Sequence, residues 1–176
     1  MQTVNIGLNN QQRQSVIELL NTTLANQYLL LIKTKKYHWD VVSPQFMTLH
    51  ELWEQHYHTL TENIDQTAER IRMLGGYPVG TAASFIRYAS LREHPGDLPS
   101  VTEMVSRLLL DHEFIVRELR DTITQSASIH GDEGTADFLT GLLRQHEEMA
   151  WMLRSFMEGE SLKSDGTRSQ VAAVAN

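Results

Sequence analysis

The first half of the sequence carries imidazole and carboxylate side chains at helical spacing. His50, Glu54, His58, Asp65 and Glu69 follow one another at intervals that fit one helix. Because steps of three and four residues keep side chains on one helical face, His50 with Glu54, and Asp65 with Glu69, can each offer two ligands to one ion. Mixed imidazole and carboxylate ligation suits Fe(II) or Zn(II) rather than Ca²⁺ or Mg²⁺.

Distance along the helix separates the two halves of this pattern. His50 and Asp65 are fifteen residues apart, which is about 22 Å at roughly 1.5 Å per residue. They cannot bind the same ion within one helix. His38 can complete the first half, since it lies six residues before Pro44 and His50 lies six residues after it. In an antiparallel hairpin these two histidines reach the same level.

A two-fold axis can complete both halves. If two copies of this helix cross antiparallel, a residue of one copy lies opposite a residue of the other when their two numbers add to a fixed sum. The pair His50 and Glu69 has the same sum as the pair Glu54 and Asp65, so both pairs can form at one crossing. An isologous interface would then place His50 and Glu54 of one chain opposite Asp65 and Glu69 of the other, giving two equivalent sites per dimer. The alternative is a solvated face, the usual role of a helix rich in Glu, Asp and His.

Four long amphipathic segments must position these side chains. Their apolar residues recur three or four apart, which predicts helices over residues 11–38, 45–74, 101–128 and 135–158. Ser43 and Pro44 interrupt the first pair, with Ser43 a candidate cap, and Gly75, Gly76 and Pro78 end the second helix.

The connection over residues 77–100 is long enough to cross a bundle, and its apolar segment at 82–91 predicts a short helix. The pattern therefore predicts an all-α four-helix bundle over residues 11–159. We expect flexible segments at 1–10 and 160–176, where the apolar period is missing.

Composition narrows the functional classes. A chain of 176 residues fits one domain, and the lack of cysteine excludes disulfides and thiolate sites. The formal charge of -7 opposes nucleic-acid binding by the folded surface. No apolar run approaches the roughly 18 residues of a membrane span, and the N-terminus lacks the order of a signal peptide. We expect a cytoplasmic protein with no membrane contact.

Several segments resemble one protein family. The resemblance is to the Dps family, the mini-ferritins named for DNA protection in starved cells. The first signature of the family is similar to His38-Trp39-Asp40-Val41, followed by Phe46 and by Leu49-His50-Glu51-Leu52-Trp53-Glu54. The second signature is similar to Ile64-Asp65-Gln66-Thr67-Ala68-Glu69-Arg70, ending with Leu74-Gly75-Gly76. The last helix of the family is similar to Trp151-Met152-Leu153-Arg154.

The resemblance implies a ferritin-like bundle assembled as a homododecameric hollow shell. The ferroxidase ligands then lie between two-fold partners, with Trp39 beside the metals. One subunit supplies His38, His50 and Glu54, and the other supplies Asp65 and Glu69. The implied activity is iron storage and detoxification: Fe(II) is oxidised to Fe(III), preferably by hydrogen peroxide, and stored as mineral. Zn(II) is a second candidate ion for the same site.

The resemblance also implies a pore through which iron enters. Asp137 is similar to the family aspartate that lines the three-fold pore, and Asp132 and Glu133 add negative charge near it, which raises the local cation concentration. The alternative is that these residues favour the helix dipole. On the third helix, His112 and Glu113 are expected to be structural or solvent-facing.

Three departures from the family pattern affect the site. Ser43 stands where glycine is usual, Glu54 where aspartate is common, and Glu148 where lysine is frequent. The longer Glu54 leaves open whether it binds metal directly or only accepts hydrogen bonds. With His58 and His146 nearby in sequence, the site is predicted to be richer in histidine. Alternatively, His58 packs at the two-fold axis and His146 is a buried or surface histidine.

Two rival functions remain. A nucleoid-binding protein would use a basic tail, yet residues 1–12 contain no Lys or Arg, and the C-terminal segment offers only Lys163 and Arg168 against Glu160 and Asp165. We therefore expect weak or no DNA binding. A purely structural bundle without redox activity would bind neither Fe(II) nor Zn(II) stoichiometrically.

Overall fold

The computed structural model describes residues 4–158, and every regular element in this range is helical. The elements are α1 (Asn10–Asp40), α2 (Phe46–Met73), α3 (Ala82–Tyr88), α4 (Val101–Thr124), the π-helical turn η1 (Gln125–Ile129) and α5 (Glu133–Glu158). This confirms the all-α bundle with a short helix in the crossover. The predicted tail at 160–176 lies outside the described residues, as do residues 1–3 of the predicted N-terminal segment. No helix within 4–158 is long and apolar enough to cross a bilayer.

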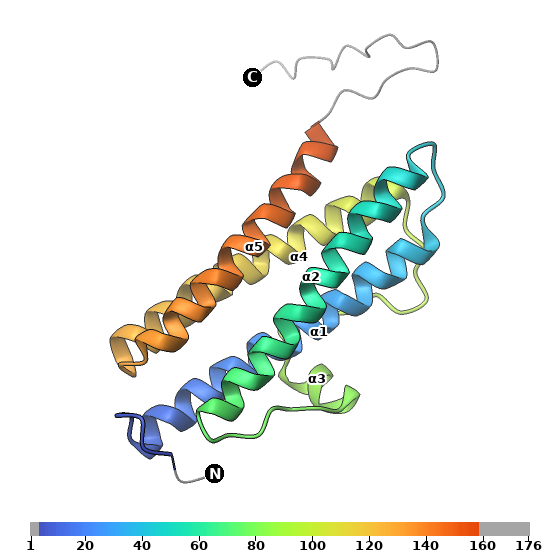
Figure 1. Cartoon of the computed structure of the whole chain (residues 1–176). Coiled ribbons are helices and arrows are strands. Elements are labelled where there is room, and N and C mark those ends of the chain that lie inside the picture. The colour runs from blue at the N-terminus through green and yellow to red at the C-terminus, as the bar shows by residue number, and fades with distance from the viewer. Residues whose placement is uncertain (1–3, 159–176) are drawn as a thin grey trace, which may run out of the picture.

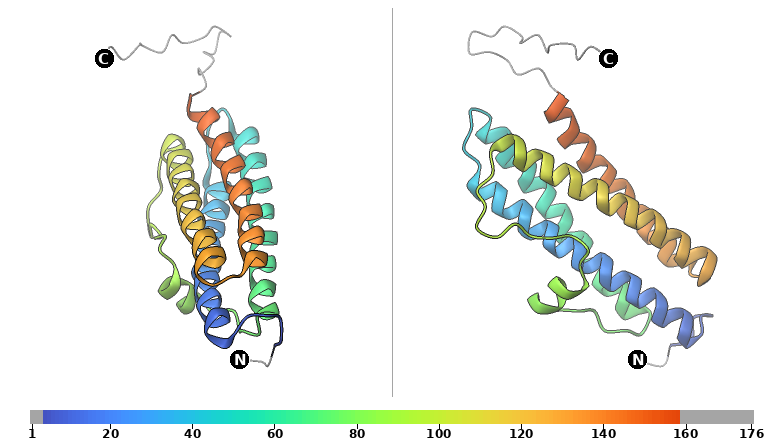
Figure 2. Two further views of the ribbon diagram at one scale, coloured as in Figure 1. Left: turned by 90° about the vertical axis from the view of Figure 1, so that its left-hand side faces the viewer. Right: turned by 180° about the vertical axis from the view of Figure 1, so that it is seen from behind.

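Two antiparallel hairpins form the bundle. Helix α1 pairs with α2 and α4 pairs with α5, while α1 also contacts α4 and α2 contacts α5 (Figures 1 and 2). The crossover carries the chain along the bundle, so that α4 begins near the turn between α1 and α2. On the way, α3 packs against α1, where Phe85 stacks on Tyr28 with ring centroids 3.9 Å apart.

The core lies between the four long helices. Large side chains from all of them are fully buried, including Leu20, Trp53, Leu108 and Leu139. These residues fall on the apolar stripes that predicted the helices, because a helix in a bundle must bury its apolar face against its neighbours.

Helix α2 ends where its glycines require. Gly75 has φ of +83°, a conformation that a side chain disfavours. The N–H of Gly75 bonds the carbonyl of Arg72, and the N–H of Gly76 bonds that of Ile71, which together form a Schellman motif. A Cβ at position 76 would lie 2.8 Å from Cδ1 of Ile17. Glycine is therefore needed at both positions.

Two helix termini differ from the prediction. Ser43 does not cap α2: its Oγ accepts a hydrogen bond from the N–H of Gln45 at 3.1 Å, and Gln45 is the N-cap residue without a side-chain cap. At the end of α4 the α-helix stops at Thr124 and continues as the π-helical turn through Ile129. In contrast, Ser100 caps α4 in a reciprocal capping box with Glu103.

Candidate metal centre

His38 and His50 face each other across the α1–α2 hairpin. Their rings stack with centroids 3.7 Å apart and planes 19° apart. Nδ1 of His38 lies 2.9 Å from the backbone oxygen of His50, and Nδ1 of His50 lies 3.0 Å from the backbone oxygen of His38. The structure thus brings together the two histidines that the spacing around Pro44 placed at one level.

These two hydrogen bonds fix the tautomer of both rings. A carbonyl oxygen only accepts, so each Nδ1 must carry a proton, and Nε2 is left as the ring nitrogen that can bind a metal. Metal-binding histidines are usually held in this way, with the second ring nitrogen donating to a carbonyl or carboxylate. His38 is buried, and Phe46 stacks on His50 with centroids 4.9 Å apart. Both rings are therefore oriented with Nε2 available to a metal.

Glu54 lies on the same part of α2 and is held by Tyr57. The Tyr57 hydroxyl donates to Oε1 of Glu54 at 3.1 Å, and the Tyr57 ring meets that of His38 edge to face, with centroids 5.2 Å apart. Burial, and then the hydrogen bond to Glu54 and its charge, raise the pKa of Tyr57, so the phenol remains a proton donor. The exposed His58 has its Nε2 4.0 Å from the same Oε1.

Asp65 and Glu69 lie farther along α2 and are exposed. Asp65 lines a shallow hollow together with His58 and Thr61. Within residues 4–158, no group of three or more His, Asp or Glu side chains is arranged to hold a metal ion. A single chain therefore carries the two predicted half-sites at separate places, as the helical distance between His50 and Asp65 requires. We call His38, His50 and Glu54 the histidine half-site, and Asp65 and Glu69 the carboxylate half-site.

Apolar side chains near the histidine half-site are left uncovered. Trp39 is 68% exposed, and Val42 and Met47 in and after the turn are also exposed. Contiguous exposed apolar residues are typical of a surface that another chain covers. Trp39 directly follows His38 in the chain, so a covering chain would also lie beside the histidine half-site.

The three acidic residues predicted to line a pore differ in their surroundings. Glu133 and Asp137 are exposed at the start of α5. Asp132 is only 4% exposed and caps α5: it accepts from the N–H and hydroxyl of Thr135 at 2.9 and 2.6 Å, and from Arg70 at 2.9 Å. Both oxygens of Asp132 are thus engaged, which assigns it to helix capping rather than to a pore.

This capping network predicts a large loss of stability on removal of Asp132. The Asp132→Ala variant loses a helix cap, which contributes about 1 kcal/mol to stability. It also leaves the largely buried Arg70 without its carboxylate partner. Together these losses should lower the free energy of unfolding by about 3 kcal/mol. Urea unfolding monitored by circular dichroism measures the change. Glu133→Ala, an exposed neighbour, is the matched control and should change stability by less than about 0.5 kcal/mol. Equal effects of the two variants would contradict the assignment.

His146 lies inside the bundle rather than beside the histidine half-site. It is fully buried on α5, and its Nδ1 lies 3.0 Å from Nδ1 of His112 on α4. His56 on α2 meets the His112 ring at a centroid distance of 5.7 Å. We call His56, His112 and His146 the interior histidine cluster. Glu113, the neighbour of His112, is half-buried and accepts from Arg154 at 2.6 Å.

The sequence reasoning missed this cluster, although a signal existed. Each of the three histidines takes a place on an apolar stripe, as His56 does three residues after Trp53 and four before Leu60. A hydrophobic pattern counts only apolar residues as core, so it does not reveal that His56 and His112 are buried.

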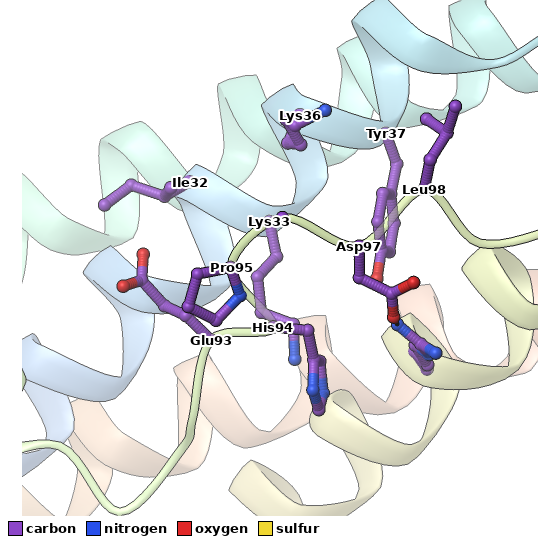
Figure 3. Close-up of a pocket in the computed structure, with 11 residues that line it drawn as sticks. Ile32, Lys33, Lys36, Tyr37, Glu93, His94, Pro95, Asp97 and Leu98 are labelled. Atoms are coloured by element: carbon purple, nitrogen blue, oxygen red, sulfur yellow. Dashed lines mark hydrogen bonds and ion pairs between the residues drawn. The ribbon is translucent and has the colours of Figure 1, made fainter.

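One pocket of the described residues lies away from all of these side chains. It has a volume of about 360 Å³ and lies beneath the crossover segment 93–98, against α1 and α4. In Figure 3 the side chains of Tyr37 and Asp97 point toward the same place, where Arg107 bonds Asp97 at 2.6 Å. Lys33 pairs with Asp111 and bonds a carbonyl at 3.3 Å. These polar groups already satisfy one another, so the pocket offers no obvious binding chemistry.

Comparison with known proteins relates the chain to a family. Residues 17–161 match the model of the ferritin-like domain. The chain is 60% identical over 168 residues to a low temperature-induced protein of Nostoc sp. (strain PCC 7120), covering 96% of this chain and 94% of that protein. It is 38% identical over 146 residues to the DNA protection during starvation protein of Brevibacillus brevis, covering 83% and 97%.

Solved structures agree with the sequence matches. The fold is similar to DpsC from Streptomyces coelicolor, with a TM-score of 0.88 and 32% identity over 92% of this chain and 94% of that one. It is also similar to a Dps protein from Vibrio cholerae O1, described as a member of a superfamily of ferritin-like diiron-carboxylate proteins. That match has a TM-score of 0.82 and 30% identity, and covers 90% of this chain and 98% of the other.

Proposed function

Because this chain belongs to the Dps family of ferritin-like proteins, we propose that it oxidises and stores iron. The family relationship supports an iron-binding mini-ferritin in general terms. The observation that carries the finer proposal is the reciprocal hydrogen bonding of His38 and His50, which leaves both Nε2 atoms ready to bind Fe(II). The proposed site is a ferroxidase centre shared between subunits.

Two chains are needed to complete each centre. His38, His50 and Glu54 of one subunit would face the partner's Asp65 and the partner's Glu69 across a two-fold axis, with Trp39 covered at the same interface. This arrangement adds two carboxylates to Glu54 of the histidine half-site, and it covers the exposed apolar residues near the turn. We propose that six such dimers form a homododecameric shell in the cytoplasm.

The reaction uses Fe(II) as substrate. Two ferrous ions held close together give one electron each to hydrogen peroxide; with two protons, this yields two water molecules and two ferric ions. The carboxylates offset the positive charge of the ions, while the neutral imidazoles hold them in place. Zn(II) suits the same ligands and would act as a competitor. Asp137 and Glu133, exposed at the start of α5, are the proposed acidic lining along which Fe(II) enters.

Nothing in the described residues favours nucleic-acid binding as a second function. Arg13, the first basic residue, is 3% exposed and donates to the carbonyl of Leu74 at 2.9 Å. It is therefore committed to packing and is not a contact for phosphate. The net charge of -7 also repels DNA. We propose that DNA binding is weak, although several relatives carry DNA protection in their names.

The proposal is tested by anaerobic addition of Fe(II) to the metal-free protein, followed by hydrogen peroxide. We expect rapid ferric absorbance with about one peroxide consumed per two Fe(II), and slower oxidation by O₂. A structural bundle without redox activity would oxidise Fe(II) no faster than buffer does. That result would refute the proposal.

Tyr57 should affect this reaction through Glu54. The Tyr57→Phe variant removes the hydrogen bond to Glu54 and keeps the ring against His38, so we expect Fe(II) affinity to fall about 10-fold while assembly is unchanged. Initial oxidation rates at limiting Fe(II) measure this effect. Tyr88→Phe on α3 removes a hydroxyl far from the site and is the matched control.

A double variant separates this role from general destabilisation. Glu54→Asp shortens the side chain beyond the reach of the Tyr57 hydroxyl, so Tyr57→Phe should have almost no further effect in that background. If the two substitutions instead act additively, Tyr57 does not work through Glu54.

A further inference from the structure

The interior histidine cluster is a second place where the protein collects metal-binding side chains. His56, His112 and His146 come from α2, α4 and α5, and their exposed fractions are 2%, 0% and 0%. None of them is among the residues of the proposed ferroxidase centre, which are His38, His50, Glu54, Asp65 and Glu69.

Most of the ring nitrogens in this cluster lack a hydrogen-bond partner. This holds for both nitrogens of His56 and for Nε2 of His112 and of His146. A buried polar atom without a partner costs about 1–3 kcal/mol, and an apolar side chain would fill the same space without that cost. The three histidines are therefore poor core residues unless something binds them.

The rings are neutral and surrounded by no opposite charge. Burial lowers the pKa of His56 to about 4 and that of His146 to about 3, and it holds the pKa of His112 well below its usual range. Among the described residues, the only influences on the pKa of His112 and His146 besides burial come from other histidines of the cluster. Each imidazole thus keeps a lone pair at physiological pH, as a metal ligand must.

The spacing of one pair fits a shared ion. Two imidazole nitrogens on a tetrahedral ion, with bonds of about 2.0–2.1 Å, lie roughly 3.3 Å apart. Nδ1 of His112 and Nδ1 of His146 are 3.0 Å apart. The two nitrogens need to move apart by only a few tenths of an ångström to bind the same ion. His56 does not yet converge on the same point, since the described residues hold no preformed group of three ligands. It can turn without giving up a hydrogen bond.

We propose that the interior histidine cluster binds one zinc-class divalent cation, with His112 and His146 as the first ligands and His56 as the third. Imidazole donors suit Zn(II), Cu(II), Ni(II) and Fe(II), and the lack of a carboxylate excludes Ca²⁺ and Mg²⁺. Three histidines and a solvent molecule form a known zinc donor set. The bound ion ties α2, α4 and α5 together, so its binding energy stabilises the folded bundle.

The test uses the full-length protein with His50→Ala and Asp65→Ala, which lacks ligands of the proposed ferroxidase centre. After removal of metal with a chelator, Zn(II) is added under equilibrium dialysis. We expect about one ion per subunit, together with a higher unfolding temperature. Adding His56→Leu should weaken Zn(II) binding about 10-fold, and adding His112→Gln should weaken it further. His130→Gln, outside the cluster, should change nothing.

A spectroscopic measurement keeps the test decisive if a core variant fails to fold. The zinc K-edge absorption spectrum of the His50→Ala/Asp65→Ala protein should show imidazole ligands and no carboxylate. No binding in this background, unchanged affinity in both cluster variants, or carboxylate ligation would each overturn the proposal. Because iron oxidation is not the readout, failure here leaves the proposed ferroxidase centre untouched, and failure of that centre leaves this site untouched.

Discussion

The rate of peroxide-driven Fe(II) oxidation should fall roughly 100-fold or more when His50 is replaced by alanine. Losing a residue that only supports a metal ligand already costs about 10- to 100-fold, and loss of a ligand should cost at least as much. The substitution removes one proposed ligand directly. It also removes the ring that stacks on His38 and the hydrogen bond that the His50 ring donates to the His38 backbone. The helices should remain folded, because His50 is not among the fully buried core residues.

Asp65→Ala should produce a loss of the same size, although Asp65 is about 22 Å from His50 along the same helix. Glu62→Ala is the matched control, since Glu62 is an exposed carboxylate one turn from Asp65 and is not a proposed ligand. Stopped-flow ferric absorbance gives the rates, and size-exclusion chromatography checks the assembly. An Asp65→Ala protein as active as the Glu62→Ala protein would show that the carboxylate half-site is wrongly assigned.

The second large effect is loss of stability in mild acid. His112 and His146 are neutral in the folded, metal-free protein because burial lowers both pKa values. In the unfolded chain they titrate near pH 6.5. Below that pH the unfolded state binds more protons, so stability is fully present above about pH 6.5 and falls as the pH drops toward the folded pKa values. Each histidine contributes a slope of about 1.4 kcal/mol per pH unit.

Urea unfolding in chelator at several pH values between about 6.5 and 4.5 measures this slope. This pH range avoids the protonation of carboxylates such as Asp97 and Glu103. Their pKa values are lowered in the folded protein, so the stability that they contribute is lost only at lower pH. His146→Leu should reduce the slope by about 1.4 kcal/mol per pH unit, since one proton fewer is taken up. His130→Gln serves as the control. If the His146→Leu protein shows the same slope as the wild-type protein, His146 is not buried as a neutral group.

The helices were predictable because their cause is visible in the sequence. Leu20, Trp53 and Leu119 lie on apolar stripes that must be buried. Gly75 ends α2 through its positive φ, and Gly76 through its close approach to Ile17. The ends of α2 and α4 were less predictable. Whether Ser43 caps a helix or closes a turn depends on backbone angles at Gln45, and the π-helical turn after Thr124 depends on how α4 meets α5.

The candidate site was predictable in part. The symmetric spacing around Pro44 placed His38 and His50 at one level, and the structure stacks their rings. Their reciprocal hydrogen bonds could not be predicted, because they depend on side-chain torsions. The support of Glu54 by Tyr57 also requires coordinates, although the three-residue spacing allowed it. The interior histidine cluster stayed hidden, since sequence alone does not show that α2, α4 and α5 bring His56, His112 and His146 together.

Each ferroxidase centre should take ligands from two subunits, and mixing of variant subunits tests this most directly. His50→Ala and Asp65→Ala subunits are inactive separately, but a mixed pair contains one centre with both defects and one with none. In an equal, random mixture half of the pairs are mixed, so we expect recovery of about a quarter of the wild-type oxidation rate. Activity that stays at the level of the single variants would contradict a shared centre.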